Sequence, residues 1–190
     1  MKNLANFLFE VGMLKRTPRT GFQFLGSGAE SVAEHSFRTA IIGYTLAQMD
    51  GTADIGRVLQ LCLFHDLPEA RTGDLNYVNK KYVRVDEQRA VEDLARNLPF
   101  GDDYRQTLNE FDARESRESE LAHDADQLEM ILALKEYKDL GNRYADQWYP
   151  FAVERLQTQV AKELAVTIWE TDSTRWWFDD DAEWWINGKK

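Results

Sequence analysis

The stretch LQLCLFHDLPEARTGD, residues 59–74, is the most informative part of the chain. Its largely apolar run, residues 59–64, ends abruptly in an imidazole and a carboxylate, His65 and Asp66. A second carboxylate, Glu69, follows three residues later. Because burying an unpaired charge is costly, an apolar segment that ends in this way needs a partner for its charges. A metal ion would be such a partner.

Two further candidate ligands stand elsewhere in the chain, His35 and Asp126. Taken with His65 and Asp66, they offer a mixture of nitrogen and oxygen ligands that suits Mn²⁺, Fe²⁺, Co²⁺, Ni²⁺ or Zn²⁺. Four protein ligands would leave positions on a six-coordinate ion open for water and substrate. Each residue alone also has a structural interpretation, as a hydrogen-bonded histidine or an exposed carboxylate. The spacing of the four therefore leaves both interpretations open.

The composition is typical of a globular protein, since 43% of the 190 residues are apolar and 29% are charged. We expect one domain over residues 1–175 and a Trp-rich acidic tail over residues 176–190. No segment is long and apolar enough to span a membrane, so we expect no membrane partner. Glu10 interrupts any signal-peptide pattern, and Cys62 is the only cysteine. These features predict a cytoplasmic protein without disulfides.

The net charge of −10 argues against extended binding to nucleic acid, which requires clustered lysine and arginine side chains. It leaves room for a small phosphorylated substrate, because such a ligand needs only a local cation or metal.

The hydrophobic pattern has a helical period almost throughout, and no segment shows a convincing strand pattern. We expect an all-α bundle of about six or more helices. A kink is expected near His65, because Pro68 suits the first turn of a helix better than its interior. The predicted helices cover residues 4–14, 31–50, 54–65, 86–98, 117–140, one beginning near 102, and a last long helix after Pro150 that contains Leu156, Val160, Leu164 and Ile168. The predicted connections are residues 15–30 and 75–85.

The order of the candidate ligands, H…HD…D, resembles the ligand pattern of the HD-domain metal-dependent phosphohydrolases. Residues 65–74 are similar to the HD-x-x-E-x-x-x-G-D pattern of the 5′-deoxynucleotidase branch, and residues 31–35 and 124–128 resemble its flanking motifs. By the order of its elements, the resemblance covers roughly residues 4–170.

The resemblance implies a single-domain, HD-type helical bundle that binds one divalent metal ion through His35, His65, Asp66 and Asp126. Asp124 competes with Asp126, but residues two apart lie about 200° apart around a helix, and the family pattern selects Asp126. The resemblance further implies a homodimer and a deoxyribonucleoside 5′-monophosphate as substrate. It also implies that Glu69 handles the nucleophilic water and that Asp74 supports either Glu69 or the sugar. Arg19 or, alternatively, Arg16 would bind the phosphate.

Two other functions stay open. The first is a phosphodiesterase or nucleoside triphosphate hydrolase on the same scaffold, although only His123 is left over as an additional histidine ligand. The second is a non-catalytic helical oligomer with a structural or sensory metal site. The tail tryptophans, Trp176, Trp177, Trp184 and Trp185, could dock on the helical body or form a dimer contact.

Overall fold

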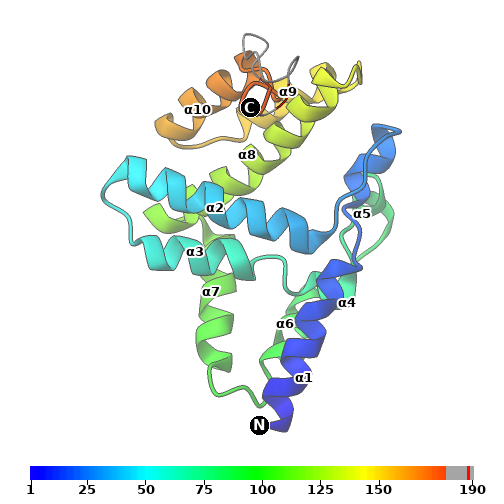
Figure 1. Cartoon of the computed structure of the whole chain (residues 1–190). Coiled ribbons are helices and arrows are strands. Elements are labelled where there is room, and N and C mark those ends of the chain that lie inside the picture. The colour runs from blue at the N-terminus through cyan, green and yellow to red at the C-terminus, as the bar shows by residue number, and fades with distance from the viewer. Residues whose placement is uncertain (179–187, 189–190) are drawn as a thin grey trace.

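Helices α2 (Val32–Asp50) and α3 (Ile55–Phe64) cross the middle of the molecule side by side and bring the first histidine close to the HD dipeptide (Figure 1). The computed structural model describes residues 1–178 and 188. Gly43 allows the two helices to approach closely, because a Cβ atom at this position would lie 2.5 Å from the Sγ atom of Cys62. The pairing of α2 with α3 is the base on which the candidate site is built.

The central core is formed by α2 and α3 with three later helices, α8 (Arg117–Asp139), α9 (Ala145–Glu154) and α10 (Gln159–Glu170). The buried side chains at its centre are aliphatic, and they include Leu46, Val58, Leu61, Leu121, Leu128 and Ile131. Burial of apolar surface of this kind is the dominant favourable contribution to folding. It fixes α8 against both α2 and α3, and thereby places the polar side chains of α8 next to theirs.

A second apolar cluster holds the other half of the molecule together. It joins α1 (Lys2–Val11) and η1 (Gly12–Lys15) to α4 (Glu69–Thr72), α6 (Glu87–Ala95) and α7 (Gly101–Ala113). Its buried members are Leu14, Val32, Leu67, Leu94, Ala95, Tyr104 and Leu108. Because α4 follows the HD dipeptide directly, this packing fixes the position of Glu69.

The expectation of an all-α bundle is confirmed: the described residues form helices and turns, with one isolated antiparallel bridge between Pro18 and Ser31. Two predicted connections contain short helices, η2 (Thr20–Phe24) and α5 (Asn79–Tyr82). A capping box is present at the start of α2, with the Ser31 side chain accepting a hydrogen bond from the Glu34 backbone.

The predicted last helix after Pro150 is present as α10, but the prediction that it contains Leu156 is wrong. Pro150 lies inside α9, and α10 begins only at Gln159. The chain breaks between them because the Thr158 side chain caps α10 by accepting a hydrogen bond from the Ala161 backbone. Both carboxylate oxygens of Asp124 hold the same turn, since they accept hydrogen bonds from the backbones of Gln157 and Thr158 at 2.8 Å.

The C-terminal tail lies only partly within the described residues. Trp176 and Trp177 are 85% and 49% exposed, whereas Trp184 and Trp185 fall outside the described part of the chain. The boundary between residues 175 and 176 stays a prediction. Within the described residues, no helix combines the length and the apolar character that a membrane span requires.

Candidate metal centre

Side chains from three helices converge where α2, α3 and α8 meet. One ligand atom each of His35, His65 and Asp126 lie within 4.8 Å of one another. Asp66 lies between the two histidines, with Oδ2 3.4 Å from His35 Nε2 and Oδ1 3.3 Å from His65 Nε2. The Oδ1 atom of Asp126 lies 3.2 Å from His35 Nε2. The four residues expected to hold a metal therefore form one cluster.

The end of α3 explains how the adjacent residues His65 and Asp66 reach the same centre. Regular α-helical hydrogen bonding stops here, and Leu67 and Glu69 instead donate to the carbonyls three residues before them, at 3.1 and 3.0 Å. This tighter turn lies between α3 and α4, where Pro68 cannot donate a backbone hydrogen bond. The kink expected near His65 is confirmed.

His65 is oriented by the backbone of its own helix. Its Nδ1 atom lies 2.9 Å from the carbonyl oxygen of Cys62, which can only accept, so Nδ1 carries the hydrogen. The Nε2 atom is buried and has no hydrogen-bond partner among the described residues. Buried polar atoms are rarely left without a partner. The unused lone pair of Nε2, surrounded by Asp66, Asp126 and His35, fits a divalent cation in both charge and ligand type.

His35 is oriented by a carboxylate on α8. The Nδ1 atom of His35 lies 2.8 Å from Oε2 of Glu129, and both side chains are almost completely buried. Arg38, one turn after His35, donates through Nε to Oε1 of Glu129 at 2.9 Å. A carboxylate behind a histidine fixes the tautomer and ring orientation, and this arrangement is characteristic of metal-ligating histidines.

The electrostatics of the cluster favour positive charge. Burial opposes protonation of His35, but hydrogen bonds to Asp126 and Glu129 outweigh it and raise the pKa of His35 to about 10. Burial also opposes ionisation of Asp66 and Asp126, yet His65 and His35 outweigh it and hold the pKa values of both carboxyl groups low. The carboxylates that attract a proton to His35 would attract a divalent cation in its place.

Glu69 lies beside this cluster in a different environment. Burial, together with the negative charges of Asp66 and Asp74, raises the pKa of Glu69 to about 9. Its Oε2 atom is buried without a hydrogen-bond partner among the described residues. Perturbed carboxyl groups of this kind gather at catalytic sites, where a proton must be taken up or released near neutral pH.

Arg19 and Asp74 stand at the other edge of the cluster. Arg19 Nη1 lies 3.4 Å from Oδ2 of Asp66. Burial disfavours the charged form of the Arg19 guanidinium, but the negative charges of Asp66 and Asp126 outweigh the effect of burial and raise the pKa of Arg19. The side chain therefore stays charged. Thr20 binds Asp74 twice, through its backbone N–H to Oδ2 at 2.7 Å and through its hydroxyl to the Asp74 carbonyl at 2.9 Å. Arg19 thus lies beside the centre, whereas Arg16 is exposed.

Sequence reasoning missed Glu129 and Arg38. A helical spacing could have indicated them, because Glu129 follows Asp126 by three residues and Arg38 follows His35 by three. Asp124 instead accepts hydrogen bonds from the backbone and the hydroxyl of Thr158, the N-cap residue of α10. His123 is a structural residue, because its Nε2 atom lies 2.7 Å from the carbonyl of Phe111 and its ring stacks on the Phe111 ring.

Comparison with known families and curated proteins agrees with this geometry. The HD domain family model matches residues 11–169. A 5′-deoxynucleotidase of Bos taurus is 34% identical over 150 residues, which cover 75% of this chain and 71% of the relative. A 5′-deoxynucleotidase of Homo sapiens is 32% identical over 150 residues, covering 75% of this chain and 72% of the relative.

Solved structures share the same architecture. A Pyrococcus horikoshii protein superposes with a TM-score of 0.72 at 29% identity, covering 87% of this chain and 98% of its own. A Magnetospirillum magnetotacticum protein, described as a predicted metal-dependent phosphohydrolase, superposes with a TM-score of 0.67 at 25% identity, covering 88% of this chain and 89% of its own.

Proposed function

The chain belongs to the HD domain family, and from this premise we propose that it is a metal-dependent hydrolase that releases phosphate from deoxyribonucleoside 5′-monophosphates. The observation that carries the proposal is the convergence of His35, His65, Asp66 and Asp126 beside Glu69, whose buried Oε2 atom has no hydrogen-bond partner among the described residues. The relatives that bear the name 5′-deoxynucleotidase support the substrate class.

The four clustered side chains would hold one divalent metal ion, with Mn²⁺, Co²⁺, Fe²⁺, Ni²⁺ and Zn²⁺ as candidates by ligand type. Such an ion lowers the pKa of water and stabilises charge on a phosphoryl oxygen. Glu129 and Arg38 keep His35 in the tautomer that directs Nε2 toward the cluster. The Cys62 carbonyl does the same for His65.

Glu69 is proposed to orient and deprotonate the attacking water. Positive charge held at the cluster offsets the negative charges of Asp66 and Asp74 that raise its pKa, and so favours the ionised form that a general base requires. The water oxygen forms a bond to phosphorus while the bond from phosphorus to the 5′ oxygen breaks. The 5′ oxygen takes up the proton that Glu69 removed from the water, and the nucleoside leaves.

Arg19 is proposed to bind the phosphate. Its guanidinium stays charged, and its planar donors match two phosphate oxygens at once. Asp74 is a positioning residue in this account, because it anchors the Thr20 backbone next to Arg19.

A phosphate-release assay tests the proposal. Purified protein is loaded with each candidate metal in turn and supplied with the four common deoxyribonucleoside 5′-monophosphates. We expect phosphate release by the wild type and by Glu154→Gln, which alters an exposed carboxylate on α9. We expect loss of release in Glu69→Gln with metal still bound. Hydrolysis of only phosphodiesters or triphosphates would contradict the proposal, as would bound metal without any hydrolysis.

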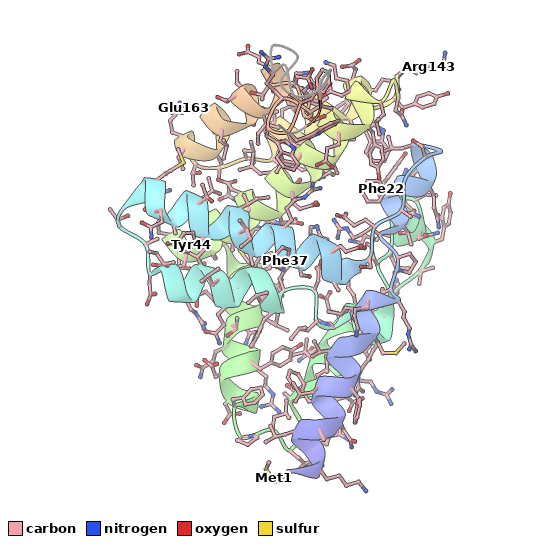
Figure 2. The ribbon with its side chains drawn as sticks, in the orientation of Figure 1. Met1, Phe22, Phe37, Tyr44, Arg143 and Glu163 are labelled. Atoms are coloured by element: carbon pink, nitrogen blue, oxygen red, sulfur yellow. The ribbon has the colours of Figure 1, made fainter. Side chains whose placement is uncertain are left out.

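We further propose that the protein is a homodimer. Phe37, Ile41 and Tyr44 are 69%, 54% and 45% exposed and follow the i, i+4, i+7 spacing of one helical face. Phe37 and Tyr44 lie on the same outward face of α2 (Figure 2). An exposed apolar stripe supports an interface with a second copy. Sedimentation equilibrium of the wild type and of Ile41→Glu tests this, with a dimer expected only for the wild type.

The cytoplasmic location also stays a proposal. It rests on Cys62, the single cysteine, whose thiol is completely buried against α2. Fractionation of the source cells would test it.

A further inference from the structure

A cavity of about 440 Å³ opens between α6 and α7 and has His65 in its wall. This volume lies within the range of about 300–1,000 Å³ that is typical of small-molecule sites. His65 is 4% exposed at its side chain and also belongs to the candidate metal centre, where its Nε2 atom has no hydrogen-bond partner among the described residues. The cavity and the metal centre therefore share the residue His65.

The cavity has an apolar part and an acidic rim. Val91 and Leu108, which both contribute to the second apolar cluster, line its interior. The carboxylates of Glu87 on α6 and Asp112 on α7 line the rim. Seven of the nine lining residues are polar, so the two apolar side chains give a base a small contact surface among several hydrogen-bonding groups.

The charges of the rim disfavour phosphate as the ligand of this cavity. Arg105 is the cation that lines it, but its Nε and Nη1 atoms donate to Glu92 and Asp102 at 2.9 and 2.8 Å. Burial and the neighbouring Asp112 raise the pKa of Glu87, which shows that the two acidic groups repel each other's charge. The rim therefore offers hydrogen-bond acceptors to a ligand that carries donors.

We propose that this cavity receives the nucleoside part of the substrate, and that Glu87 and Asp112 select bases that carry an exocyclic amine. The inference rests on the proposed hydrolase function, because a phosphate at the metal centre places the nucleoside next to His65. Carboxylates accept hydrogen bonds from the amino groups of cytosine, adenine and guanine. Thymine has no exocyclic amine, and its single edge donor, N3–H, lies between two carbonyl oxygens to which ionised carboxylates cannot donate.

Steady-state kinetics on the metal-loaded protein test the assignment. The double variant Glu87→Ala, Asp112→Ala is compared with the wild type and with Glu154→Ala, a matched exposed carboxylate on α9. Hydrogen bonds to charged groups contribute about 1.5–3 kcal/mol, and partial exposure reduces this, so we expect KM for dAMP, dCMP and dGMP to rise roughly tenfold in the double variant. KM for dTMP and kcat for all four substrates should stay within about twofold.

Equal losses for all four nucleotides, or no change in any of them, would overturn the assignment. Ligand-observed NMR with the free nucleosides provides a second readout that needs no hydrolysis. Deoxyadenosine and deoxycytidine should bind the wild type more strongly than thymidine does, and the double variant should abolish the difference. If the protein hydrolyses no nucleotide yet shows this binding preference, the proposed function fails while the cavity assignment stands.

Discussion

Glu129 Oε2 lies 2.8 Å from Nδ1 of His35, although α8 and α2 are far apart in sequence and both side chains are almost completely buried. The contact places a negative charge behind the histidine and directs its other nitrogen into the cluster. Arg38 balances the charge of Glu129 from the same helix as His35. The ligand and its support are therefore built from the same pair of helices.

Weakening this support should weaken metal binding. Glu129→Gln keeps the shape of the side chain but removes its charge, and loss of such supporting contacts typically lowers metal affinity 10- to 100-fold. The matched control is Glu136→Gln, because Glu136 also accepts a hydrogen bond from Arg38, at 2.7 Å, but is exposed. Calorimetric titration with Mn²⁺ and Co²⁺ measures the metal affinities of both variants and of the wild type. Equal affinities for the wild type and Glu129→Gln would contradict the role of Glu129.

The two neighbouring aspartates of α8 should have opposite effects. Asp124→Ala leaves the buried donors of Thr158 without an acceptor, so we expect a loss of about 3 kcal/mol in the free energy of unfolding with metal stoichiometry unchanged. Asp126→Ala should abolish metal binding and leave the contacts between Asp124 and Thr158 intact. Urea unfolding and metal analysis check the pair. Loss of metal binding in Asp124→Ala but not in Asp126→Ala would reverse the assignment.

Glu69→Gln should stabilise the metal-free protein. The pKa of Glu69 is raised to about 9 in the folded chain, so folding favours the protonated form. The contribution of protonated Glu69 to the free energy of unfolding is fully present below the unfolded pKa of about 4.5 and is lost as the pH rises toward 9. At about pH 8 the neutral amide of the variant does not undergo this loss. We therefore expect the free energy of unfolding to rise by about 1 kcal/mol, which corresponds to an increase of roughly 2–4 °C in Tm. Thermal unfolding in the presence of a chelator measures this difference in Tm. An unchanged Tm would contradict the burial and charge repulsion that raise the pKa of Glu69.

Metal binding should strengthen as the pH rises. The pKa of His35 is raised to about 10, so a cation that binds its Nε2 atom must displace a proton. The apparent affinity should rise by up to about tenfold per pH unit for each proton displaced, at pH values below that pKa. Titrations in buffers of different ionisation enthalpy count the protons released. Affinity that is independent of pH, with no proton release, would contradict the ligand role of His35.

Much of the site could be predicted because its signal is local. The apolar run before His65, the proline after Asp66 and the capping box at Ser31 each act within a few residues. These short-range effects place the ends of α2 and α3, and therefore the two histidines. The resemblance added the choice of Asp126 over Asp124, and the structure has Asp126 beside His35.

The parts that escaped prediction depend on contacts between distant segments. In sequence, Glu129 looks like an ordinary helical acid, and its burial is decided by His35 and Arg38 on α2. The break between α9 and α10 is likewise held by Asp124, which lies 34 residues before Thr158. Helical periodicity continues through that break, so a local pattern could not reveal it.

The most direct test of the central claim measures bound metal and phosphate release in the same samples of wild type and Glu69→Gln. Both proteins should bind one divalent ion, and only the wild type should release phosphate from a deoxyribonucleoside 5′-monophosphate. Metal-loaded wild-type protein that releases no phosphate from any of these nucleotides would contradict the central claim.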